Sequence, residues 1–261
     1  AATCVIITGG IDLSSGSVLA LAGVAAALLV KSGVPVPAAM LGGVVVGAMC
    51  GAVNGFCITQ LKLPPFIATL GMMLIARGLA LQVTGARAIS GLGESFGELG
   101  NGVLWRIERD TGGTFPEVVF PGIPYPVVLM VVIAVAVSIM LSRTTFGRHI
   151  YAVGSNAEAA RLSGVKVGRV TLLVYTLSGA LSGLTGCVLM SRLVTAQPNE
   201  GVMYELDAIA SAVIGGASLI GGIGTISGTV IGSFVIGILR NGLNMNGVSS
   251  FIQQIIIGLV I

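Results

Sequence analysis

The sequence predicts an all-α membrane protein, a polytopic helical bundle of about eight to ten transmembrane helices with broken or re-entrant segments. Of the 261 residues, 54% are hydrophobic and only 9% are charged, whereas soluble domains carry about 25% charged residues. Glycine occurs 40 times, about twice its usual share of ~7%, which in an apolar chain indicates closely packed helices. Aromatic residues make up 5%, which argues against an outer-membrane β-barrel.

The candidate spans are the uncharged apolar runs, because a bilayer core about 30 Å thick requires roughly 17 to 25 apolar residues per helix. Several runs are short or interrupted by glycine. The chain begins and ends inside apolar runs, so we expect a single domain over 1–261 that is truncated at both ends. The spans are 17–30, 37–60, 66–84, 126–142, 170–190, 206–220, 225–239 and 247–261, with the end of another at 1–8.

The distribution of charge predicts the orientation, because loops rich in Lys and Arg stay in the cytoplasm. The connection 143–169 has one acidic residue, Glu158, and is predicted to be cytoplasmic. Counting spans from it makes 85–125 an external loop, with a short helix expected over 104–109, and places 192–207 outside as well. The basic residues of the cytoplasmic connection are Arg143, Arg148, Arg161, Lys166 and Arg169; the acidic residues of the external loop are Glu94, Glu98, Glu108, Asp110 and Glu117.

The middle of the cytoplasmic connection predicts a short exposed helix. Asn156 is a favourable N-cap, residues 157–162 favour a helix, and Gly164 suits the turn that ends it. Its alanines leave a narrow face that fits a groove on another protein. Glu158 and Arg161, three positions apart, can pair with each other or with that partner.

Glycines break two apolar runs, at Gly9-Gly10 before Asp12 and within 215–224. Interrupted helices at membrane depth expose backbone groups, so such breaks tend to flank a transport path. The competing interpretation is tight helix packing. Asp12 can also cap the helix that begins near Ser14.

Polar side chains inside the spans require a partner or a function, because burying an unpaired polar group costs several kcal/mol. The neutral ones suit either a path for a solute with hydroxyl groups or hydrogen bonds between helices. For Arg77 we expect a carboxylate partner across the bundle. The neutral residues are Asn54, Thr69, Gln82, Asn241 and Asn244.

The sequence indicates no catalytic site, no metal site and no cofactor. His149 is the only histidine, and the four cysteines form no C-x-x-C pair, which favours small buried side chains. No G-x-x-x-x-G-K-[ST] motif occurs, so any ATP hydrolysis belongs to a partner. The net charge of +3 gives no indication of nucleic-acid binding.

Several motifs together resemble the permeases of ATP-binding-cassette (ABC) importers of the monosaccharide type, those for ribose, xylose, galactose and inositol. Glu158-Ala159-Ala160 followed by Gly164 is similar to the EAA-x-x-x-G loop that meets the ATPase subunit. The resemblance runs in order over nearly the whole chain. The matching stretches are GGIDLSSGS at 9–17, LPPFIATLG at 63–71, AQP at 196–198, YELDAIA at 204–210 and NGLN at 241–244.

The resemblance implies a multi-pass permease subunit of the bacterial inner membrane that imports a monosaccharide or polyol. Its implied partners, besides the lipid bilayer, are an ABC ATPase on the cytoplasmic side, a periplasmic sugar-binding protein and a second permease subunit in a homodimer. The ATPase-coupling residues would be Asn156, Glu158, Ala159, Ala160, Arg161 and Gly164, and the candidate path residues are Gly10, Asp12, Ser14, Asn54, Gln197, Asn241 and Asn244.

Three alternatives remain at this stage. A secondary transporter driven by protons or sodium needs titratable groups near the bilayer midplane, and Asp12 and Arg77 are the few available. A branched-chain amino-acid ABC permease is a close relative of the sugar type, and only the resemblance of the motifs separates the two for this sequence. A membrane-embedded enzyme lacks a nucleophile with its base, or a carboxylate pair, at plausible spacing.

Overall fold

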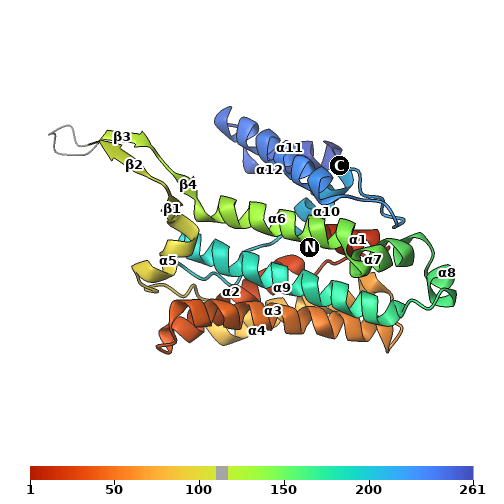
Figure 1. Ribbon diagram of the computed structural model, residues 1–261. Coiled ribbons are helices and arrows are strands. Elements are labelled where there is room, and N and C mark those ends of the chain that lie inside the picture. Colours follow the sequence, from red (N-terminus) through yellow and green to blue (C-terminus); the bar gives the residue numbers. More distant parts are fainter. Residues whose placement is uncertain (110–116, 261) are drawn as a thin grey trace.

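The computed structural model describes residues 1–109 and 117–260, and these form a bundle of helices from which a segment of short paired strands projects (Figure 1). The all-α fold class is therefore confirmed. The helices are α1 Ala2–Ile7, α2 Ser15–Lys31, α3 Val36–Thr59, α4 Pro65–Thr84, α5 Glu94–Asn101, α6 Tyr125–Arg143, α7 Thr145–Ser155, α8 Ala157–Leu162, α9 Val167–Leu193, α10 Tyr204–Ile214, α11 Ile226–Met245 and α12 Ser250–Val260.

Within the described ranges, α3, α4, α6, α9 and α11 are long and apolar enough to cross a membrane, and α2 is a shorter apolar helix. Proline sets several of their starts: α3, α4 and α6 each carry Pro in the first turn, where its missing N–H costs nothing. Many large apolar side chains on α3, α4, α6 and α11 are exposed, among them Leu41, Leu74, Val132 and Ile238. An apolar exterior on long helices is what a lipid environment requires.

The structure corrects one boundary and one expected helix. Helix α10 ends at Ile214 rather than near residue 220, because Gly216 adopts φ +89° and turns the chain. The helix expected over 104–109 is wrong: β1 (Val103–Leu104) pairs with β4 (Ile123–Pro124), and β2 (Ile107–Arg109) pairs with β3 (Glu117–Phe120), both antiparallel. The only helix described in that predicted loop is α5, which lies before these strands.

One of the predicted acidic residues of the external loop, Asp110, lies outside the described residues, and so do the side chains of Glu108 and Glu117.

Helices α3 and α9 pack backbone to backbone through glycine. A Cβ atom at Gly51 would lie 3.0 Å from the Gly179 Cα, and one at Gly179 would lie 2.8 Å from the Gly51 Cα. Gly47 and Gly183 continue the contact along both helices, where a Cβ at Gly47 would lie 2.9 Å from the Gly183 Cα. We call these four glycines the glycine seam. Small residues that let helices touch are the usual means of association in a bilayer, as the sequence predicts.

The connection after α3 lies at the same end of the bundle as the predicted cytoplasmic connection, and the two predicted external connections lie together at the other end. Thr59 and Gln60, at the end of α3, line one groove together with Gly164 and the start of α9. At the other end of α9, the Ser191 hydroxyl accepts from the Gly100 amide of α5 at 2.8 Å. Since α9 has 27 residues, these two ends are about 40 Å apart. We refer to them as the α8 end and the α5 end (Figure 1).

Candidate functional site

Asp12 is the centre of a buried polar cluster in the break between α1 and α2. Its Oδ1 accepts from the Ser14 amide at 2.9 Å and the Ser14 hydroxyl at 2.6 Å, and its Oδ2 accepts from the Ser178 hydroxyl at 2.7 Å. Asn54 Nδ2 donates to the Ser14 hydroxyl at 2.9 Å. Asp12 is 7% exposed and Asn54 is 2% exposed. Four hydrogen bonds therefore join the start of α2, α3 and α9 at the Asp12 carboxylate and the Ser14 hydroxyl.

The broken backbone itself is also hydrogen-bonded. The carbonyl oxygen of Ile11 lies 3.5 Å from the Tyr175 hydroxyl and 3.3 Å from the Thr69 hydroxyl, which it shares with the Pro65 carbonyl at 3.0 Å. A Cβ at Gly10 would collide with the Tyr175 hydroxyl, so only glycine fits there. Thr69 and Tyr175 come from α4 and α9, which satisfy a carbonyl that the interrupted helix leaves free.

A cavity of about 500 Å³ opens beside this cluster, between α1, α2, α6, α9, α10 and α11. Its walls are mostly apolar, with one carboxylate, that of Asp12, and several hydroxyls. No Lys or Arg is among the residues that line it. The hydroxyl-bearing side chains are those of Thr3, Ser15, Ser178, Ser182, Thr185, Tyr204, Ser211, Thr229 and Ser233.

The predicted path residues fall into two groups. Gly10, Asp12, Ser14 and Asn54 lie together in the buried cluster. Three others do not join them and are exposed, one in the connection after α9 and two near the end of α11: Gln197, Asn241 and Asn244.

Arg77 binds backbone carbonyls and not the carboxylate that we expected as its partner. Its guanidinium donates to the carbonyl oxygens of Pro198 at 2.5 Å and Glu200 at 2.8 Å, and these bonds fix the connection after α9 onto α4. The described ion pairs are Arg161 with Glu158 and Arg240 with Asp207. Backbone carbonyls are adequate partners for a membrane cation, so a carboxylate is not required.

The segment 156–164 forms the predicted short helix, α8. Asn156 Oδ1 accepts from the Ala159 amide at 3.0 Å, which caps its start. Gly164 adopts φ +86°, and its amide donates to the Arg161 carbonyl at 3.0 Å, which ends it. Arg161 and Glu158 pair at 2.8 Å on the exposed face, while Ala160 is buried in the apolar cluster beneath. The helix therefore projects its charged face outward from a fixed apolar base.

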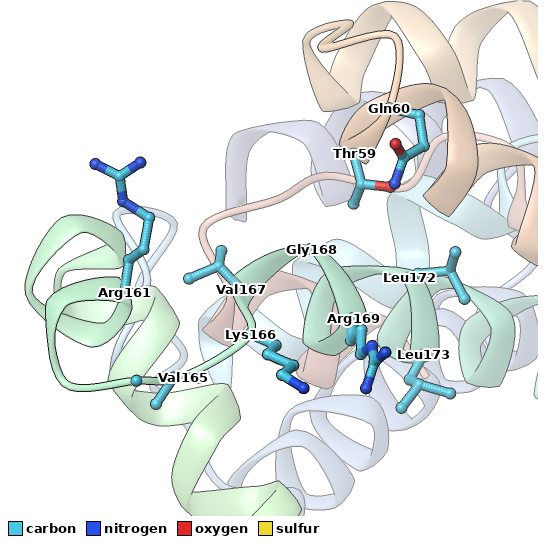
Figure 2. A pocket seen from close by; sticks show the side chains of 11 residues that line it. Thr59, Gln60, Arg161, Val165, Lys166, Val167, Gly168, Arg169, Leu172 and Leu173 are labelled. Atoms are coloured by element: carbon cyan, nitrogen blue, oxygen red, sulfur yellow. The ribbon is translucent and has the colours of Figure 1, made fainter.

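A groove of about 690 Å³ lies beside α8, between the end of α3 and the start of α9. Figure 2 shows Thr59 and Gln60 facing the first turns of α9 across this groove, with the Arg161 side chain extending away from α9. Lys166 and Arg169 are exposed and form no ion pair within the described part of the chain. The surface around α8 is thus basic and open.

Sequence reasoning missed Ser178, Tyr175 and Tyr151. Ser178 and Ser182 are four apart in an uncharged run, and this pattern signals a polar stripe on a helix. Tyr175 carries no comparable signal, because its partner is the backbone of Ile11. Tyr151 donates to the Gly224 carbonyl at 2.7 Å, and burial raises the pKa of its phenol above the ordinary value.

Within residues 1–109 and 117–260, no group of three or more His, Cys, Asp or Glu side chains is placed to bind a metal ion. All four cysteines are free thiols.

The chain is similar over nearly its whole length to sugar permeases. It is 47% identical to the ribose import permease protein of Bacillus subtilis strain 168 over 259 residues, which cover 99% of this chain and 76% of that protein. It is 43% identical to the ribose import permease protein of Escherichia coli K12 over 260 residues, 99% of this chain and 77% of that one.

A third relative, the D-allose transport system permease protein of Escherichia coli K12, is 40% identical over 254 residues, 97% of this chain and 73% of that protein. No solved structure matches the chain. The family described as the permease component of the branched-chain amino acid transport system matches residues 2–261. With that match and these relatives, the chain belongs to the family of ABC-type transport-system permease components.

Proposed function

We propose that this chain is the membrane-spanning, non-catalytic subunit of an ABC importer that moves a monosaccharide or polyol into the cytoplasm. One observation carries the choice of cargo: the cavity beside Asp12 is lined by hydroxyls and one carboxylate, with no lysine or arginine side chain. Such groups hydrogen-bond sugar hydroxyls. A branched-chain amino acid would place its carboxylate near that of Asp12, with no lysine or arginine side chain in the lining to pair with it. The ribose and allose names of the relatives agree with a sugar.

The proposed path runs past Gly10, Asp12, Ser14 and Asn54, and past Ser178 and Ser182, which line the cavity with Asp12. In this proposal the α8 end faces the cytoplasm and the α5 end faces the periplasm, in a bacterial inner membrane. Gln197, Asn241 and Asn244 would then serve the outer part of the path, toward the second subunit or the binding protein.

The proposed motor contact is α8, with Asn156, Glu158, Ala159, Ala160, Arg161 and Gly164. A capped helix with a buried alanine base and an exposed ion pair transmits a push as one piece. We propose an ABC ATPase as the partner of α8 and a sugar-binding protein as the partner of the α5 end. We propose that a second copy of the chain lies beside this one in the membrane.

An ion-coupled carrier is less well supported. It requires a carboxyl group that gains and loses its proton or cation during the cycle. Asp12 is the one carboxylate lining the cavity, and three hydrogen bonds already hold it.

The test is uptake by the complete permease, reconstituted in liposomes with its ATPase inside and its binding protein outside. Labelled ribose, allose, xylose and leucine are offered separately, with ATP or with a proton or sodium gradient. We expect sugar accumulation that depends on ATP and on the binding protein. Accumulation driven by an ion gradient without ATP, or of leucine alone, would overturn the proposal.

A further inference from the structure

The last turn of α7 meets both helix breaks at one point, although it contributes nothing to the cavity. Helix α7 ends at Ser155, directly before the Asn156 cap of α8. The first break follows α1 at Ile7, and the second is the glycine-rich connection 215–224 between α10 and α11. The Gly222 amide donates to the Ile7 carbonyl at 2.8 Å, so the two breaks are bonded to each other.

Glycine makes this three-way contact possible. A Cβ at Gly154 would collide with the Ile7 carbonyl oxygen and lie 2.7 Å from the Gly222 amide nitrogen. A Cβ at Gly221 would lie 2.8 Å from the Gly154 carbonyl oxygen and 3.0 Å from the Gly9 amide nitrogen. Distances below about 3 Å are closer than a carbon atom packs against backbone. Three backbone segments of the chain therefore touch here with no side chain between them.

Tyr151 fixes the same contact one turn earlier on α7. Its hydroxyl donates to the Gly224 carbonyl at 2.7 Å, across 73 positions of sequence. Ile150 and Val153 on the same helix are buried with Val5 and Ile7 of α1. The end of α7 is therefore attached to the first break by packing and to the second by a hydrogen bond.

The first break leads to the polar cluster within a few residues. Ile7 ends α1, and Asp12 follows it after the glycines at 9 and 10. Since Gly10 sits against the Tyr175 hydroxyl and the Ile11 carbonyl is held from α4 and α9, this stretch has little slack. A displacement of α7 is transmitted to Asp12 through a short and well-packed segment.

We infer that Gly154 and Tyr151 are positioning residues for transport: they join the end of α7, and through it α8, to both helix breaks. This inference rests on the proposed function, because it assigns a mechanical role within ATP-driven import. A push on α8 moves the end of α7, and both breaks move with it as one joint. Neither residue touches the cavity, so both act on the path through Ile7 and through the connection 215–224.

The test compares Gly154→Ala and Tyr151→Phe with wild type in the reconstituted importer. Gly78→Ala is the matched control, because Gly78 is also helical and has open space where a Cβ would stand. The quantities measured are ATP hydrolysis with and without sugar-loaded binding protein, sugar transported per ATP, and retention of the ATPase on the purified permease.

We expect Tyr151→Phe to lower the sugar transported per ATP about twofold to thirteenfold, which corresponds to the loss of one hydrogen bond of about 0.5–1.5 kcal/mol. Gly154→Ala should lower it further. In both variants the ATPase should remain bound, and the concentration of loaded binding protein that gives half-maximal hydrolysis should be unchanged. A merely structural role would instead reduce the amount of assembled complex.

A wild-type ratio of sugar to ATP in Tyr151→Phe would overturn the inference, even where Gly154→Ala fails to fold. An equal loss in Gly78→Ala would overturn it too. Failure of the proposed function is separate, because wild-type protein would then show no ATP-driven uptake at all.

Discussion

The Oδ2 atom of Asp12 accepts a hydrogen bond of 2.7 Å from the Ser178 hydroxyl, 166 positions away in the sequence. This bond joins the break before α2 to the middle of α9. A buried carboxylate without partners is strongly unfavourable, and the donors from Ser14 and Ser178 offset that cost. The break is thus stabilised by the same groups that give the cavity its polarity.

Replacing Asp12 tests this directly. Asp12→Leu leaves the Ser14 amide and the Ser178 hydroxyl without their acceptor, each at about 1–3 kcal/mol, so we expect a marked fall in the thermal unfolding midpoint in detergent. Asp12→Asn keeps one oxygen and should lower the midpoint less. An Asp12→Leu midpoint equal to that of wild type would show that these bonds do not hold the break.

Gly51→Leu should prevent α3 and α9 from packing. Its side chain would enter space occupied by the backbone of Gly179 and the carbonyl of Tyr175, and overpacking typically costs about 1–3 kcal/mol or more. Expression of folded protein, followed by size-exclusion chromatography in detergent, measures the effect. Gly237→Leu on α11 is the control, since Gly237 has open space at the Cβ position. Equal losses in both would contradict the role of the glycine seam.

Arg77→Met should release the connection after α9, because the carbonyls of Pro198 and Glu200 lose their donor. We expect cleavage by a Glu-specific protease at Glu200 to become several-fold faster, with a smaller change for Arg77→Lys, whose ammonium replaces one of the two bonds. Lys31→Met, at the exposed end of α2, serves as the control. Unchanged cleavage in Arg77→Met would mean that other contacts hold this connection.

Glu158→Lys and Gly164→Pro should uncouple transport while the permease stays folded in the membrane. The first places two cations where an ion pair of 2.8 Å stands. The second forces φ near −65° where the chain needs +86° and removes the amide that donates to Arg161. We expect uptake to fall at least about tenfold, whereas Arg161→Lys, which keeps the charge, should retain most activity. Normal uptake and ATPase stimulation in both variants would count against α8 as the motor contact.

Local features of the sequence predicted much of this structure. Hydropathy located the long helices, and Asn156 and Gly164 marked both ends of α8, because caps and turns depend on neighbouring residues. The partner of Arg77 could not be predicted, since the carbonyls that bind it lie more than a hundred positions away. The same holds for Ser178 at Asp12. Residues 104–109 were misjudged because pairing with 117–124 outweighs their local preference.

The glycine seam limits how this molecule can move. Where two helices meet without side chains, there is nothing to repack, so sliding one past the other would simply open a gap. Helices α3 and α9 are therefore expected to move as one rigid unit. Shape change during a cycle is left to the elements around it, and α1 and α10 must move together, because the Gly222 amide bonds the break after α10 to the Ile7 carbonyl at the end of α1.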